Sequence, residues 1–381
     1  MTRPRLAFVV PYGYPALAGH AESSGFDYVG GAEMQQARLL RTLAARGHDV
    51  WMVSADFGQP RRVTVDGVIV ERAYAPFAGI RGLRFFHPRW SGVLRALERV
   101  RPDVVYQRTA GALTGQCALW ARARGRRFVF ACAHDFDTLR DSPAMGSVRG
   151  RVLYHWGLTH ADRVLAQTAA QAAGLRENWG IEAALVRNLI PLPEQPRPLE
   201  QADAVLWLGT IKADKRPQWV LDAARALPET RFVVAGGPPP APMSDADFQE
   251  FRAQAARLPN VEVLGFVPPD RVPALFANAA LFAHTSPAEG FPNTLLEAWA
   301  QGVPSVSAVD PDGAVSAFDT GIVAPDVTAF VGALGALMAD AARRRALGAG
   351  ARAYVERWHA PQAVATAFES ALGLAHAMGA D

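Results

Sequence analysis

The chain contains the stretch Ala204-Val205-Leu206-Trp207-Leu208, which continues directly into Gly209-Thr210-Ile211-Lys212. Five apolar residues in a row followed by a glycine are typical of a buried strand that ends in a turn. Similar apolar runs follow, separated by helical patterns, at 232–235, 261–264, 281–284 and 304–307. Continuous apolar strands with helices between them predict a parallel sheet covered on both faces.

The first half of the chain has the same pattern. Its helical pattern at 34–46 lies among apolar runs at 6–10, 50–53, 104–106, 128–133 and 163–166. Four prolines within eight residues, at 191, 193, 196 and 198, then predict a stiff linker. We therefore expect an α/β fold with two doubly wound, Rossmann-like domains facing each other across a cleft. The domains cover 1–190 and 204–357, and the linker covers 191–203.

Composition excludes several classes of protein. The 381 residues suffice for two domains at about 150 residues each. Half of the residues are hydrophobic and a fifth are charged, as in globular proteins. The longest apolar runs are too short for a membrane-spanning helix, and the run at the N-terminus is too short for a signal peptide. Only Cys117 and Cys132 are present, too few for a disulfide framework, so we expect a cytoplasmic location.

Charge is distributed unevenly along the chain. Residues 1–190 hold 25 arginines and 15 acidic residues, a net charge of +10, whereas residues 191–381 hold 14 basic and 21 acidic residues, a net charge of −7. The first half is therefore expected to meet an anionic partner. Lys212 and Lys215 are the only lysines in the sequence, and both follow the strand at 204–208. A compact ammonium suits a diphosphate, although short basic clusters are often only solvated turns.

Residues 287–298 read Pro-Ala-Glu-Gly-Phe-Pro-Asn-Thr-Leu-Leu-Glu-Ala and carry the most specific pattern. A strand ends before this segment and a helix begins near Thr294, with Pro292 where helix starts tolerate proline. Amides at a helix start bind anions. Glu289 lies beside that start and Glu297 one turn inside the helix, where both carboxylates can accept hydrogen bonds from sugar or ribose hydroxyls. The alternative is a glutamate placed by the helix dipole and a solvated Glu297.

These residues resemble a known family. Glu289-Gly290-Phe291-Pro292 with Glu297 eight positions on resembles the E-x₇-E signature of retaining glycosyltransferases with the GT-B fold, specifically glycosyltransferase family 4, or group 1. The resemblance extends over nearly the whole chain. Further matching segments are Gly30-Gly31-Ala32-Glu33 (glycine-rich loop), Ala133-His134-Asp135 (strand-end histidine), Leu264-Gly265-Phe266-Val267-Pro268 (base-binding loop) and the loop 319–325.

The resemblance implies roles for individual residues. His134, Glu289 and Lys215 would be catalytic: His134 under the transferring sugar, Glu289 at the sugar hydroxyls and Lys215 at the diphosphate. Glu297 would accept from the ribose. The other donor-binding residues would be Gly30, Gly31, Gly209, Thr210, Lys212, Val267, Gly290, Phe291, Pro292, Asn293 and Thr294. Pro292 has no N–H, so its neighbours would donate. The family usually has an arginine where this chain has Thr210, and Lys212 is the candidate to replace it.

The implied activity is transfer of a hexose, with retention and without a metal or other cofactor. The donor would be a UDP- or GDP-sugar, and the acceptor a saccharide or a lipid-linked molecule in bacterial surface polysaccharide or glycolipid biosynthesis. A last helix over 358–381 would cross back onto the first domain. The alternatives are a nucleotide-sugar 2-epimerase of similar fold and a non-catalytic nucleotide or nucleic-acid binder. The two carboxylates lie too close along one loop and helix for an obvious hydrolase pair.

No metal site is expected. The tripeptides Asp135-Phe136-Asp137, Asp245-Ala246-Asp247 and Asp310-Pro311-Asp312 spell the D-x-D diphosphate–metal motif, but such tripeptides arise easily by chance. The nine histidines have no metal-ligand spacing.

The segment 81–90 interleaves arginines with bulky apolar residues, and Arg95, Arg99 and Arg101 follow it. This pattern fits peripheral contact with anionic lipid at the inner face of a membrane. It fits equally a helix packed by its aromatic residues with solvated arginines. Single-stranded nucleic acid is a weaker alternative, because no nucleic-acid-binding signature accompanies the segment, and no nucleic-acid partner is expected.

Overall fold

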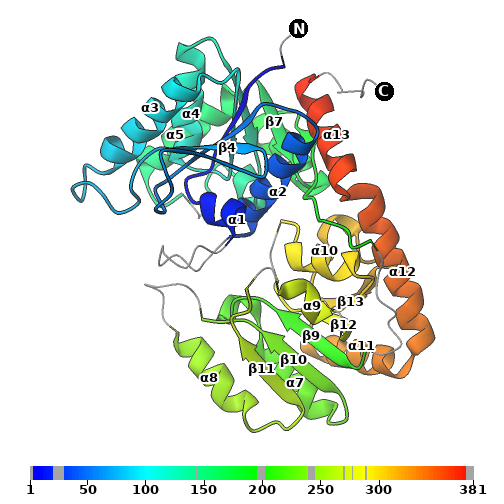
Figure 1. Cartoon of the computed structure of the whole chain (residues 1–381). Helices are drawn as coiled ribbons and strands as arrows, with labels where there is room; N and C mark the ends of the chain where they lie inside the picture. Colours follow the sequence, from blue (N-terminus) through cyan, green and yellow to red (C-terminus); the bar gives the residue numbers. More distant parts are fainter. Residues whose placement is uncertain are drawn as a thin grey trace. The chain divides into compact units, whose positions relative to one another are not determined.

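The computed structural model describes residues 3–19, 30–142, 145–194, 202–238, 245–268, 271–276, 278–287 and 290–374. It divides into two compact units (Figure 1). Unit 1 comprises Met1–Leu189 with Pro361–Asp381, and unit 2 comprises Ile190–Ala360. The part of the expected linker that is described, 191–194, therefore belongs to unit 2, and the C-terminal segment that joins unit 1 begins at Pro361 rather than at 358.

Unit 1 contains an eight-stranded sheet in the order β3-β4-β2-β1-β5-β6-β7-β8. All neighbouring strands are parallel except β3 and β4. The strands are β1 (Leu6–Val9), β2 (Val50–Ser54), β3 (Arg62–Val65), β4 (Val68–Arg72), β5 (Val104–Arg108), β6 (Arg127–Ala131), β7 (Arg163–Ala166) and β8 (Ala184–Leu185). The predicted parallel α/β sheet is confirmed, with strand ends shifted by one or two residues.

The antiparallel hairpin β3–β4 is absent from the sequence-based prediction. Its turn is Asp66-Gly67, with φ of 48° and 78°. Positive φ at two successive turn residues matches the right-handed twist of paired strands, and Asp-Gly is a preferred sequence for it. The hairpin places β3 at the edge of the sheet, where its side chains alternate between exposed and half-buried.

The helices of unit 1 cover both faces of its sheet. They are α1 (Tyr14–Ala18), α2 (Gly31–Ala45), η1 (Phe85–Trp90), α3 (Ser91–Val100), α4 (Ala112–Ala123), η2 (Asp135–Thr138), α5 (Val148–Thr159), α6 (Ala169–Trp179) and α13 (Pro361–Leu372). Successive strand residues point to opposite faces, so the interior forms two clusters. One cluster contains residues of α2 and α13, and the other contains residues of α3, α4 and α5. Both faces are therefore buried, as a parallel sheet requires.

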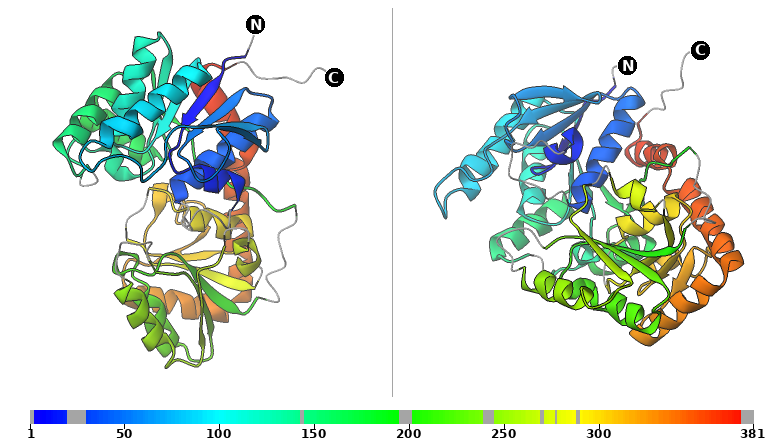
Figure 2. Two further views of the ribbon diagram at one scale, coloured as in Figure 1. Left: turned by 60° about the vertical axis from the view of Figure 1, so that its left-hand side comes forward. Right: turned by 60° about the horizontal axis from the view of Figure 1, so that its bottom comes forward.

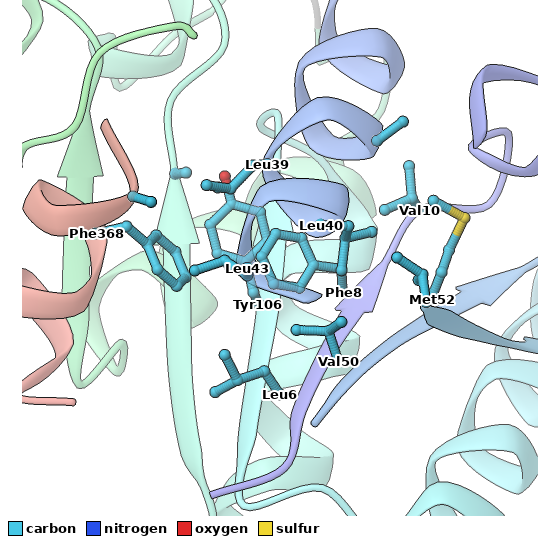
Figure 3. Packing of buried hydrophobic residues seen from close by; sticks show 14 of the residues in the cluster. Leu6, Phe8, Val10, Leu39, Leu40, Leu43, Val50, Met52, Tyr106 and Phe368 are labelled. Atoms are coloured by element: carbon cyan, nitrogen blue, oxygen red, sulfur yellow. The ribbon is translucent and has the colours of Figure 1, made fainter. Parts of the chain in front are cut away.

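Helix α13 joins the core of unit 1 although it lies at the other end of the sequence. Its Phe368 ring lies 5.9 Å from that of Phe8 and 5.8 Å from that of Tyr106 (Figure 3). Figure 2 shows α13 beside α2. On the same helix, the Glu369 side chain is 1% exposed and accepts hydrogen bonds from Arg46 at 2.6 Å and from His48 at 2.8 Å. A buried carboxylate is thus matched by two donors from the turn that follows α2.

Unit 2 contains a six-stranded sheet in the order β11-β10-β9-β12-β13-β14, parallel throughout. The strands are β9 (Ala204–Leu208), β10 (Arg231–Ala235), β11 (Val261–Gly265), β12 (Ala279–His284), β13 (Ser305–Ser307) and β14 (Gly321–Val323). The helices are η4 (Ala213–Lys215), α7 (Gln218–Ala226), α8 (Ala246–Ala255), α9 (Val272–Phe276), α10 (Asn293–Ala300), η5 (Pro311–Gly313), α11 (Val327–Ala339) and α12 (Ala341–Trp358). Residues of α10 and α12 share one core cluster, and residues of α7, α8 and α11 share the other. Among the described residues, no helix combines the length and apolar composition needed to span a bilayer.

Glu369→Gln should destabilise unit 1. The Arg46 guanidinium holds the pKa of Glu369 well below its usual range, at about 2. A depressed carboxyl pKa contributes stability above the unfolded-state pKa, near 4.3 for glutamate, and that stability is lost as the pH falls through the folded-state pKa. We expect the variant to lose about 3 kcal/mol of unfolding free energy at neutral pH in urea denaturation. The difference from wild type should shrink between about pH 4.5 and pH 2.

Glu356→Gln is the matched control. Its carboxylate pairs with Arg352 but is half exposed, so its removal should cost less than about 1 kcal/mol. Equal losses in the two variants, or a Glu369→Gln deficit that grows on acidification, would contradict this assignment.

Candidate functional site

The carboxyl end of the unit 2 sheet holds Lys215 through a chain of hydrogen bonds. The Trp207 indole Nε1, at the end of β9, donates to Thr285 Oγ1 at 2.9 Å. The Thr285 hydroxyl donates to the Lys215 carbonyl at 2.6 Å, and Lys215 Nζ donates to Ser286 Oγ at 3.2 Å. Thr285 and Ser286 directly follow β12 and are buried. The ammonium is therefore anchored on the loop that leads from β12 to α10.

Lys212 is held differently. Its Nζ lies 2.9 Å from Asp214 Oδ2, within the same turn, and the Asp214 side chain is 64% exposed. Thr210, where the family usually has an arginine, is half-buried. Lys212 thus pairs within its own loop, whereas Lys215 reaches the neighbouring strand end.

Helix α10 begins where the sequence predicts. Pro292 precedes it in an extended conformation (φ −63°, ψ 122°), and no side chain of the described residues caps it. Phe291 is only 4% exposed, with its ring 6.1 Å from Trp299 and 5.0 Å from His359. The Phe291 ring thus belongs to the core and fixes the start of the helix. The backbone N–H groups of Phe291, Asn293 and Thr294 lie at this helix start, and helix starts in general attract anions.

Of the two glutamates of the signature, the structure describes Glu297. Glu289 lies outside the described residues. Glu297 is half-buried on α10, one turn after Asn293 and therefore on the same side of the helix. Gly290, between Glu289 and Phe291, is buried.

The glycines at the ends of β9 and β10 have a packing reason. A Cβ on Gly236 would lie 1.9 Å from the Gly209 carbonyl oxygen, so no larger residue fits there. Gly209 donates its N–H to Ala235 at 3.1 Å. After β11, Val267 is half-buried against the core, whereas Phe266 is 54% exposed. The loops after β9, β10 and β11 thus leave the same edge of the sheet as the loop that bears Ser286.

In unit 1, His134 caps a short helical turn after β6. Its Nδ1 accepts from the Phe136 N–H at 3.2 Å. Since a neutral imidazole has one donor and one acceptor nitrogen, Nε2 carries the proton and is a hydrogen-bond donor. The ring stacks on Phe136, with centroids 4.3 Å apart. This geometry suits a donor to a hydroxyl oxygen better than a general base.

Asp137 holds this loop in place. Its Oδ2 accepts from the N–H groups of Ala133 at 2.7 Å and His134 at 3.1 Å, and its Oδ1 accepts from that of Ala110 at 3.2 Å. The carboxylate is 2% exposed, and burial raises its pKa. Asp137 is thus a positioning residue for His134, a role that the sequence does not reveal.

A second group missed by the sequence analysis lies at the ends of β5 and β7. Arg108 Nη2 donates to Gln167 Oε1 at 3.0 Å and to Asn188 Oδ1 at 2.8 Å. Gln167 Nε2 donates in turn to the Ala133 carbonyl at 2.6 Å, next to His134. Arg108 Nε is buried and has no hydrogen-bond partner among the described residues. The sequence feature that could have indicated this network is the presence of polar residues at the ends of apolar strands, such as Gln167 after β7.

Thr109, which follows β5, has a φ of 81°. A β-branched residue with positive φ is a strained exception, and such strain is concentrated at functional sites. Its carbonyl accepts from Gln107 Nε2 at 2.8 Å, and its N–H donates to Ala131 at 3.1 Å. The surrounding bonds thus hold Thr109 in this conformation, one residue from Arg108.

Gly30 and Gly31 lie at the start of α2, also in unit 1. Gly30 is the residue before the first turn, and a Cβ there would meet Glu33 Oε2 at 2.3 Å. Burial raises the pKa of Glu33. Gly30 is therefore explained by the Glu33 side chain folding back over the helix start.

The acidic tripeptides have local structural roles. Asp135 accepts from Gln171 at 2.9 Å, and Asp310 accepts from the Val315 N–H at 2.7 Å. Within the described ranges, no group of three or more histidine, cysteine or acidic residues is arranged to hold a metal ion. Cys117 and Cys132 are buried free thiols, and burial raises the pKa of each.

Two family profiles match the chain. The profile described as "Glycosyl transferases group 1" matches residues 202–340, and "Glycosyl transferase 4-like domain" matches residues 30–193. The chain belongs to the group 1 glycosyltransferases. This assignment agrees with the resemblance drawn from the signature segment and the strand-end histidine.

Relatives of this glycosyltransferase support the assignment. It is 28% identical over 360 residues to a D-inositol 3-phosphate glycosyltransferase of Nocardia farcinica, covering 84% of this chain and 79% of the relative. It is also 28% identical over 373 residues to a 2-deoxystreptamine N-acetyl-D-glucosaminyltransferase of Streptomyces fradiae, covering 84% and 85%.

Solved structures share the fold of the glycosyltransferase. Sucrose-phosphate synthase of Thermosynechococcus elongatus has a TM-score of 0.76 at 19% identity, covering 97% of this chain and 98% of that one. HepE of Anabaena, in complex with UDP and glucose, has a TM-score of 0.75 at 17% identity, covering 97% and 99%. The fold is therefore GT-B, built from two Rossmann-like α/β units.

Thr109→Gly should change stability and activity in opposite directions. Relief of the positive-φ strain is expected to exceed the extra chain entropy of glycine, raising the unfolding free energy by about 1 kcal/mol. Loss of the fixed loop geometry should lower the glycosyl-transfer rate about tenfold or more. Thr230→Gly, at a residue without positive φ, is the control and should destabilise by about 0.5–1 kcal/mol. A Thr109→Gly variant that is destabilised as much as the control would contradict the strain argument.

Proposed function

We propose that the protein is a retaining, metal-independent hexosyltransferase that uses a UDP- or GDP-sugar. The observation that carries this proposal is the anchoring of the Lys215 ammonium at Ser286, on the loop that leads to the start of α10. Both features favour a negatively charged group near the same loop. A nucleoside diphosphate is an anion of suitable charge and size.

The proposed reaction breaks the bond between the anomeric carbon of the sugar and a diphosphate oxygen, and forms a bond from that carbon to the acceptor hydroxyl oxygen on the same face of the sugar. The hydroxyl proton would pass to the leaving diphosphate. Negative charge then develops on the leaving diphosphate. Lys215 and the first amides of α10 would stabilise that charge in the transition state, where electrostatic stabilisation accelerates the chemical step. Glu297 would accept from the ribose hydroxyls, and Glu289 from the sugar hydroxyls.

His134 in unit 1 would donate its Nε2–H to a hydroxyl of the sugar or of the acceptor. Its Nδ1 is engaged by the Phe136 N–H, so we assign it no role as general base. The network of Arg108, Gln167 and Asn188 beside it would position a polyhydroxylated acceptor. Gly30 and Gly31 would allow the α2 loop to approach the phosphates.

We propose a saccharide or lipid-linked acceptor, in bacterial surface polysaccharide or glycolipid assembly on the cytoplasmic side of the membrane. The names of the relatives suggest a narrower class of acceptor, the cyclitols. D-inositol 3-phosphate and 2-deoxystreptamine are both substituted cyclohexane rings with several hydroxyls. A cyclitol would offer the same hydrogen-bonding groups as a hexose acceptor.

Lys215 should matter more than Lys212 for donor binding. Removal of a charge-assisted hydrogen bond by Lys215→Ala should weaken binding of UDP or GDP at least about tenfold. Lys212→Ala should weaken it less than about threefold, because Lys212 pairs with the exposed Asp214. Isothermal titration calorimetry in EDTA measures both affinities.

Three results would contradict this proposal. They are the absence of UDP and GDP binding to the wild type, binding that requires a metal, and a larger loss in Lys212→Ala than in Lys215→Ala. A 2-epimerase would instead convert the donor with no acceptor present. A nucleic-acid binder would lose affinity steeply with salt.

A further inference from the structure

Unit 1 exposes large apolar side chains on two segments that are far apart in sequence. Before α3, the exposed fractions are 75% for Phe77, 72% for Ile80, 61% for Leu83 and 50% for Phe86. On the first turns of α5, Val148 is 75% and Val152 is 61% exposed. Within segment 81–90, Leu83 and Phe86 are exposed, whereas Phe85 and Trp90 are half-buried and their rings lie 5.9 Å apart.

Ring contacts join the two segments into one surface. The Arg149 guanidinium, on α5, lies 3.7 Å from the centroid of the Phe85 ring and 5.5 Å from that of Phe86. Trp90 continues the cluster, 5.9 Å from Phe85. Val148 and Val152 are one turn apart on α5 and flank Arg149. We call this surface the apolar–basic patch; it consists of Phe77, Ile80, Arg81, Leu83, Arg84, Phe86, Val148, Arg149 and Val152.

The arginines of the patch have no acidic partner among the described residues. Residues 73–97 include four arginines and no aspartate or glutamate. On α5, Arg151 pairs with Asp141 at 3.1 Å, whereas Arg149 lies over the Phe85 ring and forms no ion pair within the described ranges. Arg81 and Arg84 are exposed and form no ion pair within the part of the chain that the structure describes. Other arginines of unit 1 do pair, for example Arg5 with Asp49, Arg62 with Glu71 and Arg126 with Asp103. Unpaired arginines thus coincide with exposed apolar side chains.

We propose that the apolar–basic patch docks unit 1 on the surface of an anionic lipid bilayer. Apolar and aromatic side chains would enter the boundary between headgroups and acyl chains, while Arg81, Arg84 and Arg149 contact lipid phosphates. A second copy of the chain is a poorer occupant, because a two-fold contact would place this basic surface against itself. The proposal is independent of the donor and the acceptor of the glycosyltransferase.

Vesicle flotation with the full chain tests the proposal. One set of vesicles is an equal mixture of phosphatidylglycerol and phosphatidylcholine, and the other is phosphatidylcholine alone, each at low and high salt. We expect the wild type to bind the anionic vesicles at low salt and to bind them less at high salt. At both salt concentrations it should bind the neutral vesicles less than the anionic vesicles.

Two double variants separate charge from apolar contact. Arg81→Gln/Arg84→Gln should weaken binding about fivefold for each arginine removed. Ile80→Ser/Leu83→Ser should weaken it about tenfold or more, since two large apolar side chains no longer enter the boundary. Because all four side chains are exposed, melting temperatures should remain close to that of the wild type.

Matched controls use exposed residues elsewhere. Arg343→Gln/Arg345→Gln on α12 and Leu119→Ser/Leu139→Ser in unit 1 should bind like the wild type. Failure of the wild type to bind anionic vesicles would overturn the proposal, as would an equal loss in the controls. A dimer detected by light scattering without lipid and split by Ile80→Asp would also overturn it, assigning the patch to a second copy.

Discussion

The carboxyl end of the unit 2 sheet in this glycosyltransferase depends on the hydrogen bonds that join Trp207, Thr285 and Lys215. Trp207 and Thr285 are 3% and 1% exposed, and hydrogen bonds are strong in such surroundings because little water competes for the polar atoms. The chain of bonds connects the end of β9 to the end of β12 and fixes the backbone of Lys215. A flexible lysine side chain thereby starts from a rigid point beside the loop that leads to α10.

Unit 1 uses the same physical arrangement with different residues. Buried parallel strands cannot carry reactive groups on their faces, so polar residues gather where the strands end. Arg108 ends β5, and His134 and Gln167 follow β6 and β7. Buried Asp137 holds the His134 loop through three backbone amides. In both units, groups that would meet substrate are oriented by buried neighbours.

Much of this arrangement could be predicted from the sequence, because buried parallel strands leave continuous apolar runs. The local sequence pattern predicted the end of β9, the start of α10 near Thr294 and the position of His134 after β6. The β3–β4 hairpin was missed because β3 alternates between exposed and half-buried residues and has no continuous apolar run, although Asp66-Gly67 marks its turn.

The sequence did not predict which residues far apart in the chain contact one another. The Arg108–Gln167–Asn188 network joins residues separated by 59 and 80 positions. The different partners of Lys212 and Lys215 likewise depend on how the loop folds. The core position of Phe291 depends on its packing against Trp299 and His359, which no local pattern reports.

We propose transfer with retention from a nucleotide sugar to a hydroxylated acceptor. The most direct test is incubation of the wild type in EDTA with α-linked UDP- and GDP-hexoses and a panel of saccharide, lipid-linked and cyclitol acceptors, followed by NMR of the product. The account predicts a new α-glycoside that forms only when acceptor is present and is lost in Glu289→Gln and Lys215→Ala. A β-glycoside, or conversion of the donor without any acceptor, would contradict it.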